Sequence, residues 1–581
     1  MYWDVVERIV KQRGKQLQKY KFFEEVWEAL DSGSQLIVVR APTGCGKTEA
    51  VTAPFLKGVL TGSRKWFSLI HALPSKSLVE ALRRRMCKSL KSIGVTRATI
   101  TSNYGELLAS KPYLEGDVAV TTYDTLLYAF YGIIRPGYHV LLPLSKLIGS
   151  LLVLDEVQLL QDAYWYSMSL MPAHVSSLIE LGSQVVIMSA TIPEAVLSEV
   201  ERKVKGINRP VKIVSEDKPS RGKLTVELKE GILPQDEDIE KLILDYIVEC
   251  ENLPALIVVN TVEKAVNIYK RLIRLKADGR LRDAEPLMLH SRLTRGTRER
   301  VEGIFESEDS SGGLSKVILV ATQVIEAGLD MDLRFLLTEL SPIDSLVQRL
   351  GRVARRSDAE AIIFLDPSGG RNVYPETLLK RTLETVKGDE NFLADCVSNI
   401  QVVQALVDKV YTADVIQSLS EGKENIISEI NNLIHKFSQM LYSADIREIL
   451  STAPLLRLSY EMQCLYLAGG AYTQLMEFKP LNLDMDEVRR RIVRISCEDI
   501  SRIPPALTHN IGGENKAVLV EIELIHTEKT TSVKLNPKVE AIQKAVRKVT
   551  EDENLLFLLN PNFYEFFEGY ELGVVKPWRK E

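Results

Sequence analysis

The sequence has few cysteines and histidines, and it has no long uninterrupted apolar run. Its 581 residues include six cysteines and seven histidines. The cysteines form no Cys-x-x-Cys pair, which disfavours a disulfide framework, a zinc knuckle and an iron–sulfur cluster, so we expect a reducing, cytoplasmic setting. The longest apolar stretch, Val140 to Leu154, is interrupted by Pro143 and Lys146. It is too short and too charged to span a bilayer, and the first residues lack the apolar core of a secretory signal.

The sequence also has little net charge. Its 73 lysines and arginines oppose 78 aspartates and glutamates, which gives −5 at pH 7. This balance excludes a protein coated in basic charge, so any nucleic-acid surface must be local. Hydrophobic residues make up 45% and charged residues 26%, which is typical of globular proteins. A chain of this length is expected to hold three to four domains.

Between Leu36 and Leu365 short apolar runs alternate with helical patterns, which predicts α/β domains with parallel sheets. We expect an N-terminal helical extension over residues 1–30, a first α/β domain over 31–205 and a second over 206–370. The predicted strands are Leu36–Val39, Trp66–Ala72, Val118–Val120, Leu151–Leu154, Val185–Met188, Ala255–Val259, Pro286–Leu289, Val317–Val320, Phe335–Leu337 and Ala361–Leu365.

The remaining residues, 371–581, form a predicted C-terminal accessory domain. Its first part, about 375–470, has helical periodicity, because Ile426, Ile430, Leu433, Phe437 and Met440 recur every three or four positions. Its last part, about 490–581, is predicted to be α/β. There, apolar residues alternate over Val518 to Ile525, and a polar turn then predicts a hairpin.

A phosphate-binding loop is predicted after the first strand. The run comprises Ala41, Pro42, Thr43, Gly44, Cys45, Gly46, Lys47 and Thr48. Glycines let backbone amides turn toward phosphate oxygens, and the following helix N-terminus adds partial positive charge. In this pattern Lys47 reaches the β- and γ-phosphates, and Thr48 ligates Mg²⁺.

A buried strand then ends in two carboxylates, Asp155 and Glu156. The first is placed to hold Mg²⁺ through its waters, and the second can orient or deprotonate the attacking water. Alone, this acidic pair could equally be a solvated strand end. Together with the phosphate loop, it predicts a site that hydrolyses ATP or GTP.

Three further motifs follow in order: Ser189-Ala190-Thr191, the run from Ala321 to Asp330, and the Gln-x-x-Gly-Arg-x-x-Arg frame of Gln348, Gly351, Arg352 and Arg355. The whole series resembles the superfamily 2 helicases of the DExD/H type, which implies two tandem RecA-like domains. Arg352 and Arg355 lie three apart, so we expect them on one helical face. Guanidiniums there can neutralise charge that develops during phosphoryl transfer.

The resemblance implies roles for more residues. Gly328 and Asp330 would lie near the ATP ribose, and Ser189, Ala190 and Thr191 would couple hydrolysis to motion. The implied nucleic-acid contacts are Pro74, Ser75, Lys76, Thr121, Thr122, Asn260, Thr261, Ser291 and Thr322. Small hydroxyl and amide groups suit phosphate and sugar contacts. The same groups also serve as helix caps and turn residues, which is the alternative for each of them.

Within this superfamily, the segments from Leu256 to Ala265, Leu289 to Leu293, Gln323 to Asp332 and Gln348 to Val353 look like the CRISPR-associated helicase of type I interference systems. That resemblance implies ATP- and Mg²⁺-dependent 3′-to-5′ translocation on single-stranded DNA, duplex unwinding, and recruitment to a guide-RNA surveillance complex.

Two features depart from that family. Gln158 occupies the position where the family usually has histidine, although glutamine can still bridge to Gln348. No histidine is followed by aspartate, so we expect the family's His-Asp nuclease to be a separate chain. Two alternatives stay open: a DNA-repair or RNA helicase of the same superfamily, and a nucleotide-switched nucleic-acid clamp.

Overall fold

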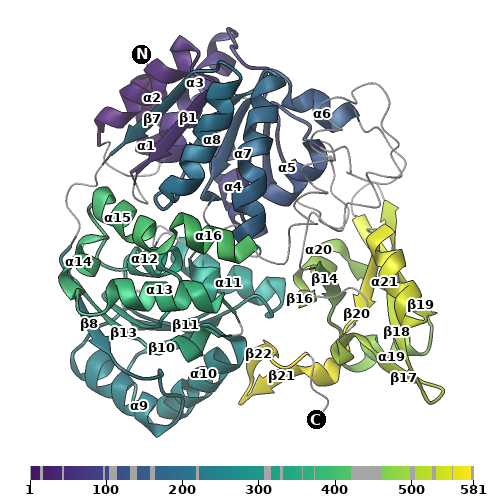
Figure 1. Ribbon diagram of the computed structural model, residues 1–581. Helices are drawn as coiled ribbons and strands as arrows, with labels where there is room; N and C mark the ends of the chain where they lie inside the picture. The colour runs from purple at the N-terminus through teal and green to yellow at the C-terminus, as the bar shows by residue number, and fades with distance from the viewer. Residues whose placement is uncertain are drawn as a thin grey trace. The chain divides into compact units, whose positions relative to one another are not determined.

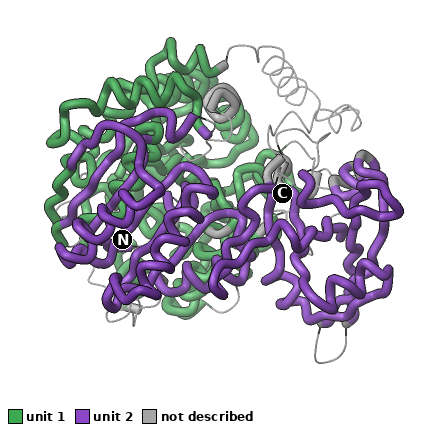
Figure 2. Tube along the Cα trace, turned by 90° about the horizontal axis from the view of Figure 1, so that it is seen from below, with its two compact units in different colours: residues 1–226, 341–358, 374–457 green, residues 227–340, 359–373, 458–581 purple. Residues whose placement is uncertain are grey.

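The computed structural model of the protein describes residues 2–12, 18–41, 45–95, 98–103, 114–130, 141–157, 164–216, 222–306, 316–326, 331–355, 357–371, 373–420, 460–497, 504–526, 531–551 and 554–577. These residues (Figure 1) fall into two compact units (Figure 2). Unit 1 comprises residues 1–226, 341–358 and 374–457, and unit 2 comprises residues 227–340, 359–373 and 458–581.

Unit 1 is built on a seven-stranded sheet in which every pairing is parallel. The order is β3-β4-β2-β5-β6-β1-β7. The strands are β1 (Leu36–Arg40), β2 (Leu69–Leu73), β3 (Ile100–Asn103), β4 (Val118–Thr122), β5 (Leu151–Asp155), β6 (Gln184–Met188) and β7 (Val211–Ser215). The central strands are apolar along their whole length, as expected for a parallel sheet that is covered on both faces.

Helices cover both faces of this sheet. Ile37 and Val39 of β1 pack with α1 (Trp3–Gln12), α2 (Lys21–Ser32), α3 (Lys47–Thr61) and α4 (Lys76–Ser92). Leu36 and Val38 belong to the opposite layer, with α5 (Tyr123–Phe130), α6 (Leu141–Leu147), α7 (Tyr164–Glu180) and α8 (Glu194–Gly206). Successive strand residues therefore point to opposite faces, each toward its own core.

Five later helices also belong to unit 1. They are α12 (Ile343–Leu350), α13 (Glu376–Val386), α14 (Glu390–Asp395), α15 (Ile400–Val410) and α16 (Ala413–Ser420). Four of them come from the predicted accessory region, so that region is divided between the two units rather than forming one body. The apolar stripe predicted over residues 426–440 lies outside the described residues.

Unit 2 contains a second, six-stranded sheet with the order β10-β11-β9-β12-β13-β8. Its strands are β8 (Leu224–Lys229), β9 (Ala255–Val258), β10 (Glu285–Leu289), β11 (Val317–Ala321), β12 (Phe335–Glu339) and β13 (Ala359–Phe364). The accompanying helices are α9 (Glu237–Ile243), the π-helical turn η3 (Leu244–Glu249), α10 (Val262–Ala277) and α11 (Arg295–Glu306), with short 3₁₀ turns η5 (Gln323–Ile325) and η6 (Pro367–Gly370).

A third, seven-stranded sheet completes unit 2; six of its strands have the order β15-β19-β18-β20-β14-β16, and β17 pairs with β18. It comprises β14 (Tyr460–Leu465), β15 (Leu481–Asp484), β16 (Ile492–Cys497), β17 (His509–Ile511), β18 (Glu514–His526), β19 (Thr531–Glu540) and β20 (Leu555–Leu558). Around it lie α19 (Gly469–Met476), α20 (Met485–Arg490), α21 (Ile542–Glu551), η8 (Pro505–Leu507) and η9 (Pro561–Phe563). The hairpin β21 (Tyr564–Phe567) and β22 (Tyr570–Val574) follows.

The predicted α/β class with two parallel sheets is confirmed, and so is the β18–β19 hairpin. Two boundaries differ from the prediction. Strand β7 pairs with β1, so the first sheet extends past residue 205; β7 is a mostly exposed edge strand, and it lacks the continuous apolar run that marks the inner strands. The helical part does not reach residue 470, because Tyr460–Leu465 is a strand. No helix among the described residues is long and apolar enough to cross a membrane.

Candidate functional site

The phosphate loop lies between β1 and α3, as predicted. Gly46 has φ +84°, which favours glycine, and a Cβ there would crowd the Phe23 ring at 3.0 Å. The Lys47 side chain is 8% exposed, and its Nζ donates to the Ala41 carbonyl at 2.7 Å. Cys45 is buried and Thr48 is half-buried. Pro42, Thr43 and Gly44 lie outside the described residues.

Asp155 is the last residue of β5 and Glu156 follows it, at the same carboxyl end of the sheet as the phosphate loop. Asp155 is 8% exposed, and its Oδ2 lies 3.1 Å from His71 Nε2. Glu156 Oε1 lies 3.9 Å from Lys47 Nζ. Glu156 also has φ +54°, which side-chain-bearing residues adopt only at a cost of about 1–2 kcal/mol. A hydrogen bond from its N–H to the Met188 carbonyl, at 2.8 Å, holds this backbone in place. Strain kept beside Lys47 makes Glu156 a candidate functional residue.

Tyr123 adds a neutral donor beside the carboxylates. Its hydroxyl donates to the Asp155 carbonyl at 2.7 Å. Burial, and then the negative charges of Asp155 and Glu156, raise the pKa of Tyr123 well above its ordinary value. The phenol therefore stays protonated at physiological pH and fixes the backbone of the carboxylate pair.

The segment Ser189-Ala190-Thr191 follows β6, the strand between β5 and β1. All three residues are buried, the Ser189 N–H donates to the Val39 carbonyl, and the Thr191 N–H donates to Ser189 Oγ. Thr191 Oγ1 is buried and has no hydrogen-bond partner among the described residues. The structure thus brings this motif next to the strand that leads into the phosphate loop.

The arginines of the last motif are not on one helical face, and this corrects the sequence prediction. Helix α12 ends at Leu350, so Gln348 is helical whereas Arg352 and Arg355 follow the helix end. Ala354 has φ +53°, and Arg355 Nε donates to the Gly351 carbonyl at 3.1 Å. Gly351, a poor helix former, ends the helix before Arg352 is reached. Residues 341–358 group with unit 1, together with the phosphate loop.

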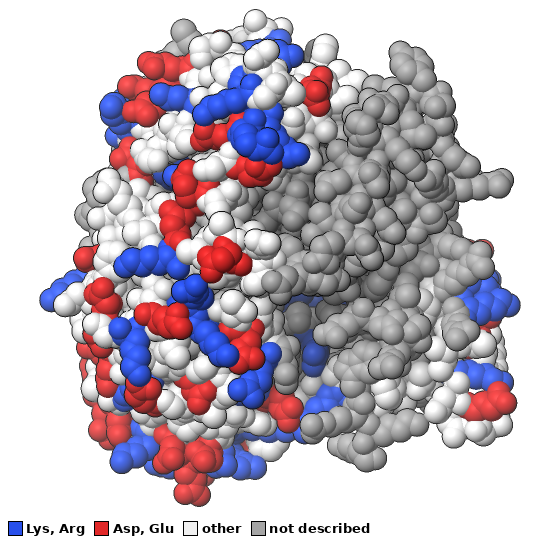
Figure 3. Space-filling model, in the orientation of Figure 1, with Lys and Arg blue, Asp and Glu red and all other residues white. Residues whose placement is uncertain are grey.

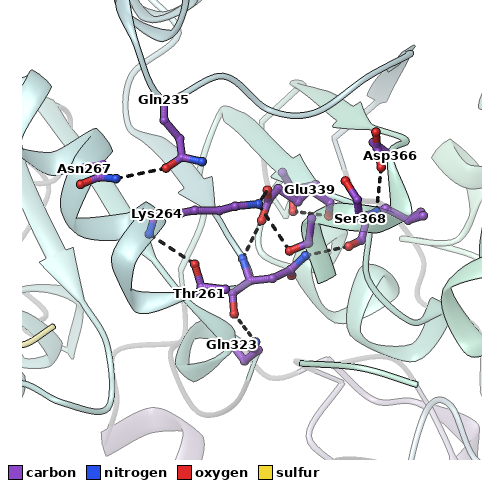
Figure 4. A network of polar contacts seen from close by, with 12 residues as sticks. Gln235, Thr261, Lys264, Asn267, Gln323, Glu339, Asp366 and Ser368 are labelled. Carbon is purple, nitrogen blue, oxygen red and sulfur yellow. Dashed lines mark hydrogen bonds and ion pairs between the residues drawn. The ribbon is translucent and has the colours of Figure 1, made fainter. Parts of the chain in front are cut away.

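In unit 2, two of the predicted nucleic-acid loops are joined by a polar network (Figure 4). Asn260 Nδ2 donates to the Leu340 carbonyl at 2.9 Å, and the Asn260 N–H donates to Glu339 Oε2 at 2.8 Å. Gln323 Nε2 donates to the Asn260 carbonyl at 2.8 Å. Glu339, which is 2% exposed, also pairs with Lys264. The network fixes the loop after β9 against the loop after β11.

Several predicted nucleic-acid contacts act as caps or are buried. Ser75 Oγ accepts from the Leu78 N–H and caps α4, and Thr261 Oγ1 caps α10 by accepting from the Lys264 N–H. Thr122 Oγ1 accepts from the Thr125 N–H. The buried members of the predicted set are Thr121, Thr122, Asn260 and Thr322, the half-buried members are Pro74, Ser75, Lys76 and Thr261, and Ser291 is exposed. Their contact with nucleic acid stays a prediction.

The loop that carries Ser291 is held by the C-terminal hairpin. His290 Nε2 lies 3.0 Å from the Leu572 carbonyl, and Arg292 Nη1 donates to the Val575 carbonyl at 2.9 Å. A Cβ on Gly573 would lie 2.4 Å from the Arg292 carbonyl oxygen, so the backbones touch. The hairpin is therefore an integral part of unit 2.

Acidic and basic side chains are interspersed over the described surface seen in Figure 3. No group of three or more histidine, cysteine, aspartate or glutamate side chains among the described residues is arranged to hold a metal ion. Gln158, Gly328 and Asp330, which have predicted roles, lie outside the described residues.

Sequence reasoning missed His71, Tyr123, Lys264 and Glu339. His71 lies near the end of a predicted strand, and it meets Asp155 only because β2 and β5 are neighbours in the sheet. Glu339 ends β12, which is the neighbour of β9. A polar residue at the carboxyl end of a predicted parallel strand was the available signal, but strand order was needed to pair these residues.

Comparisons with known proteins agree with this arrangement. Residues 21–200 match the DEAD/DEAH box helicase family, and residues 251–358 match the family described as CRISPR-associated nuclease/helicase Cas3, C-terminal. The CRISPR-associated helicase Cas3 of Thermoproteus tenax is 30% identical over 410 residues, which cover 68% of this chain and 66% of the relative. The chain belongs to the CRISPR-associated Cas3 helicase family.

Other members of the Cas3 family match over a smaller share of their length. A putative CRISPR-associated nuclease/helicase Cas3 of Methanocaldococcus jannaschii is 25% identical over 439 residues, covering 68% of this chain and 54% of that protein. A crystal structure of T. fusca Cas3 superposes with a TM-score of 0.60 at 18% identity, covering 84% of this chain and 65% of that chain. This chain thus spans between half and two thirds of these relatives.

Proposed function

We propose that the chain is an ATP-dependent motor that moves on single-stranded DNA and unwinds duplex DNA. The observation that carries this proposal is the juxtaposition of Lys47 with the Asp155–Glu156 pair at one edge of a parallel sheet, with Glu156 Oε1 3.9 Å from Lys47 Nζ. A lysine at a helix N-terminus beside two carboxylates is the arrangement that binds and hydrolyses a nucleoside triphosphate.

Each residue of this edge has a distinct task in the proposal. Lys47 binds the β- and γ-phosphates, and Glu156 orients the attacking water or takes its proton. The Thr48 hydroxyl and the Asp155 carboxylate are hard oxygen donors, which fit Mg²⁺, and bound Mg²⁺ would neutralise phosphate charge. His71 and Tyr123 hold Asp155 in place. Arg352 and Arg355 stabilise the charge that develops on the phosphoryl group.

The direction of movement and the partners are proposed from the family resemblance. We propose movement from 3′ to 5′, recruitment to a guide-RNA surveillance complex, and work beside a separate His-Asp nuclease. The helicase relatives carry CRISPR-associated names, which supports a role in interference. A near-neutral surface suits a motor that slides, because every fixed phosphate contact adds salt-dependent affinity.

The alternatives are an RNA helicase, a DNA-repair helicase and a nucleotide-switched clamp. An RNA helicase is distinguished from our proposal by measuring phosphate release with ATP and Mg²⁺. The rate with single-stranded DNA is compared with the rate with RNA of the same sequence. We expect DNA to stimulate hydrolysis more than RNA, and the Lys47→Ala variant to lose the stimulated rate. Lys57→Ala, in the last turns of the same helix, is the matched control and should keep the stimulated rate.

A clear preference for RNA would contradict the DNA proposal. If Lys47→Ala and Glu156→Gln left strand displacement unchanged, the clamp would be favoured.

A further inference from the structure

Helix α15 comes from the predicted accessory region, yet it packs inside unit 1 with α8 and α12 (Figure 1). Asn399 caps its first turn by accepting from the N–H groups of Gln401 and Val402. Its buried face comprises Ile400, Val403, Leu406, Val407 and Val410. Gln404 and Asp408 lie four residues apart and therefore share another face. The helix is thus anchored by apolar packing and presents two polar side chains to its neighbours.

Those two side chains contact the residues that directly follow the Ser189–Thr191 motif. Gln404 Nε2 donates to the Ile192 carbonyl at 3.1 Å and to the Asp408 carboxylate at 2.9 Å. Asp408 Oδ1 accepts from the N–H of Glu194, the first residue of α8, at 2.8 Å. The N-cap of α8 is Pro193, which supplies no side-chain cap. Asp408 therefore caps α8 from another helix, where a negative charge is favoured.

The end of α15 contacts the helix that leads to the arginines. The Tyr411 hydroxyl donates to Asp344 Oδ1 on α12 at 2.7 Å, and both side chains are 2% exposed. Asp344 lies four residues before Gln348, on the same helical face. Arg349 of α12 is fully buried, and its Nη2 donates to the Tyr374 hydroxyl at 3.1 Å. Helix α12 is therefore held by residues that follow it in the chain.

A further ion pair extends this set of contacts to the phosphate loop. Glu194 Oε2 lies 2.8 Å from Arg40 Nη2. Arg40 is the last residue of β1 and directly precedes Ala41. Contacts thus run from Asp344 through Tyr411 and Asp408 to Glu194 and Arg40, all within unit 1. Asp408 lies in the last turn of α15 and Tyr411 is the C-cap of that helix, so one helix end carries both contacts.

We propose that α15 is a positioning element of the ATPase, and that Tyr411 and Asp408 are positioning residues that set Arg352 and Arg355 relative to the phosphate loop. This inference rests on the proposed ATPase function. Neither residue touches substrate in this account. Tyr411 acts by fixing α12, and Asp408 acts by fixing the start of α8.

A kinetic test separates positioning from general stability. We expect Tyr411→Phe, which removes one oxygen atom, to lower kcat for ATP by about tenfold, the loss that one buried hydrogen bond to a charged group predicts. KM for ATP should stay within about twofold, because the loop residues are untouched. Asp408→Ala removes the acceptor that caps α8 and should give a similar split. Tyr472→Phe removes a hydrogen-bonded phenol in unit 2 and is the matched control, with kcat unchanged.

A double-mutant cycle decides the mechanism. If Tyr411 acts through the arginines, Tyr411→Phe should have no further effect in an Arg352→Ala/Arg355→Ala background, because both groups that it positions are gone. An unchanged kcat in Tyr411→Phe and Asp408→Ala, or a loss that adds fully to that of the Arg352→Ala/Arg355→Ala variant, would overturn the inference. If Tyr411→Phe fails to fold, Asp408→Ala decides alone. Absence of ATPase activity in the unsubstituted chain would instead overturn the proposed function.

Discussion

Polar groups at the carboxyl ends of the parallel strands are arranged differently in the two units. At the edge of the unit 1 sheet, Glu156 keeps a left-handed backbone and Lys47 lies 3.9 Å from its carboxylate. Two buried atoms there, His71 Nδ1 and Thr191 Oγ1, have no partner among the described residues. At the edge of the unit 2 sheet, Asn260 and Glu339 are bonded to neighbours on several sides.

We interpret this difference as one between the proposed ATPase site and a scaffold. Buried polar groups normally find partners, so strained or unpartnered ones indicate a place where a ligand completes the arrangement. A satisfied network instead rigidifies the loops around it. We therefore expect substitutions at the unit 1 edge to affect catalysis, and substitutions at the unit 2 edge to affect stability.

The largest effect is expected from Glu156→Gln. Loss of a general base typically lowers the rate by about 10²- to 10⁴-fold. We expect kcat for ATP to fall by that factor while the melting temperature stays unchanged, since the amide keeps the size of the side chain. Glu201→Gln, in an exposed ion pair on α8, is the matched control. A kcat within a few-fold of the unsubstituted value would exclude Glu156 as the base.

Glu339→Ala should give the complementary result. Removing one partner of a buried ion pair costs about 3–5 kcal/mol, because Lys264 is left without its carboxylate. We expect reduced stability of unit 2, measured as faster hydrogen exchange in β9 and β12. The matched control is Lys276→Ala, which breaks the more exposed pair with Glu285 and should cost less than about 1 kcal/mol. Equal effects of the two variants would contradict the scaffold assignment.

Acid should weaken both units, because each contains a buried neutral histidine. Burial lowers the pKa of His174 in unit 1 and of His290 in unit 2 to about 3. The unfolded chain binds these protons near pH 6.5 whereas the folded chain does not, so stability is present above pH 6.5 and is lost as pH falls toward 3. The loss is about 1.4 kcal/mol per pH unit for each histidine.

Two substitutions test whether these histidines make stability fall as the pH falls. His290→Gln should flatten the pH dependence of hydrogen exchange in β21 and β22 between pH 7 and 5, and His174→Gln should do so only in α7. If neither substitution changed the pH dependence of hydrogen exchange, other groups would control the acid sensitivity.

The smallest effect on the free energy of unfolding is expected from Glu156→Gly. Glycine adopts positive φ without strain, so the folded chain should gain about 1 kcal/mol at this position. ATP hydrolysis should be lost at the same time, because the carboxylate is gone. Calorimetry of this variant beside Glu156→Gln isolates the backbone contribution. A lower melting temperature in Glu156→Gly would contradict stored strain at this residue.

Local patterns in the sequence predicted much of the fold, but not its pairings. The ten predicted strands all occur, because inner strands of parallel sheets are apolar throughout. The phosphate loop and carboxylate pair were predictable from their spacing and context. Strand β7 was missed because an exposed edge strand lacks that pattern. The partners His71–Asp155 and Lys264–Glu339 depend on strand order, and the contacts of α15 depend on packing over more than 200 residues of chain.

The most direct test of the motor is displacement of a labelled strand from partial duplex DNA with a 3′ or a 5′ single-stranded overhang. The complete chain would be used with ATP and Mg²⁺. We expect displacement from the 3′-overhang substrate, dependence on ATP, and loss in the Glu156→Gln variant. ATP hydrolysis without displacement from either substrate would contradict the account.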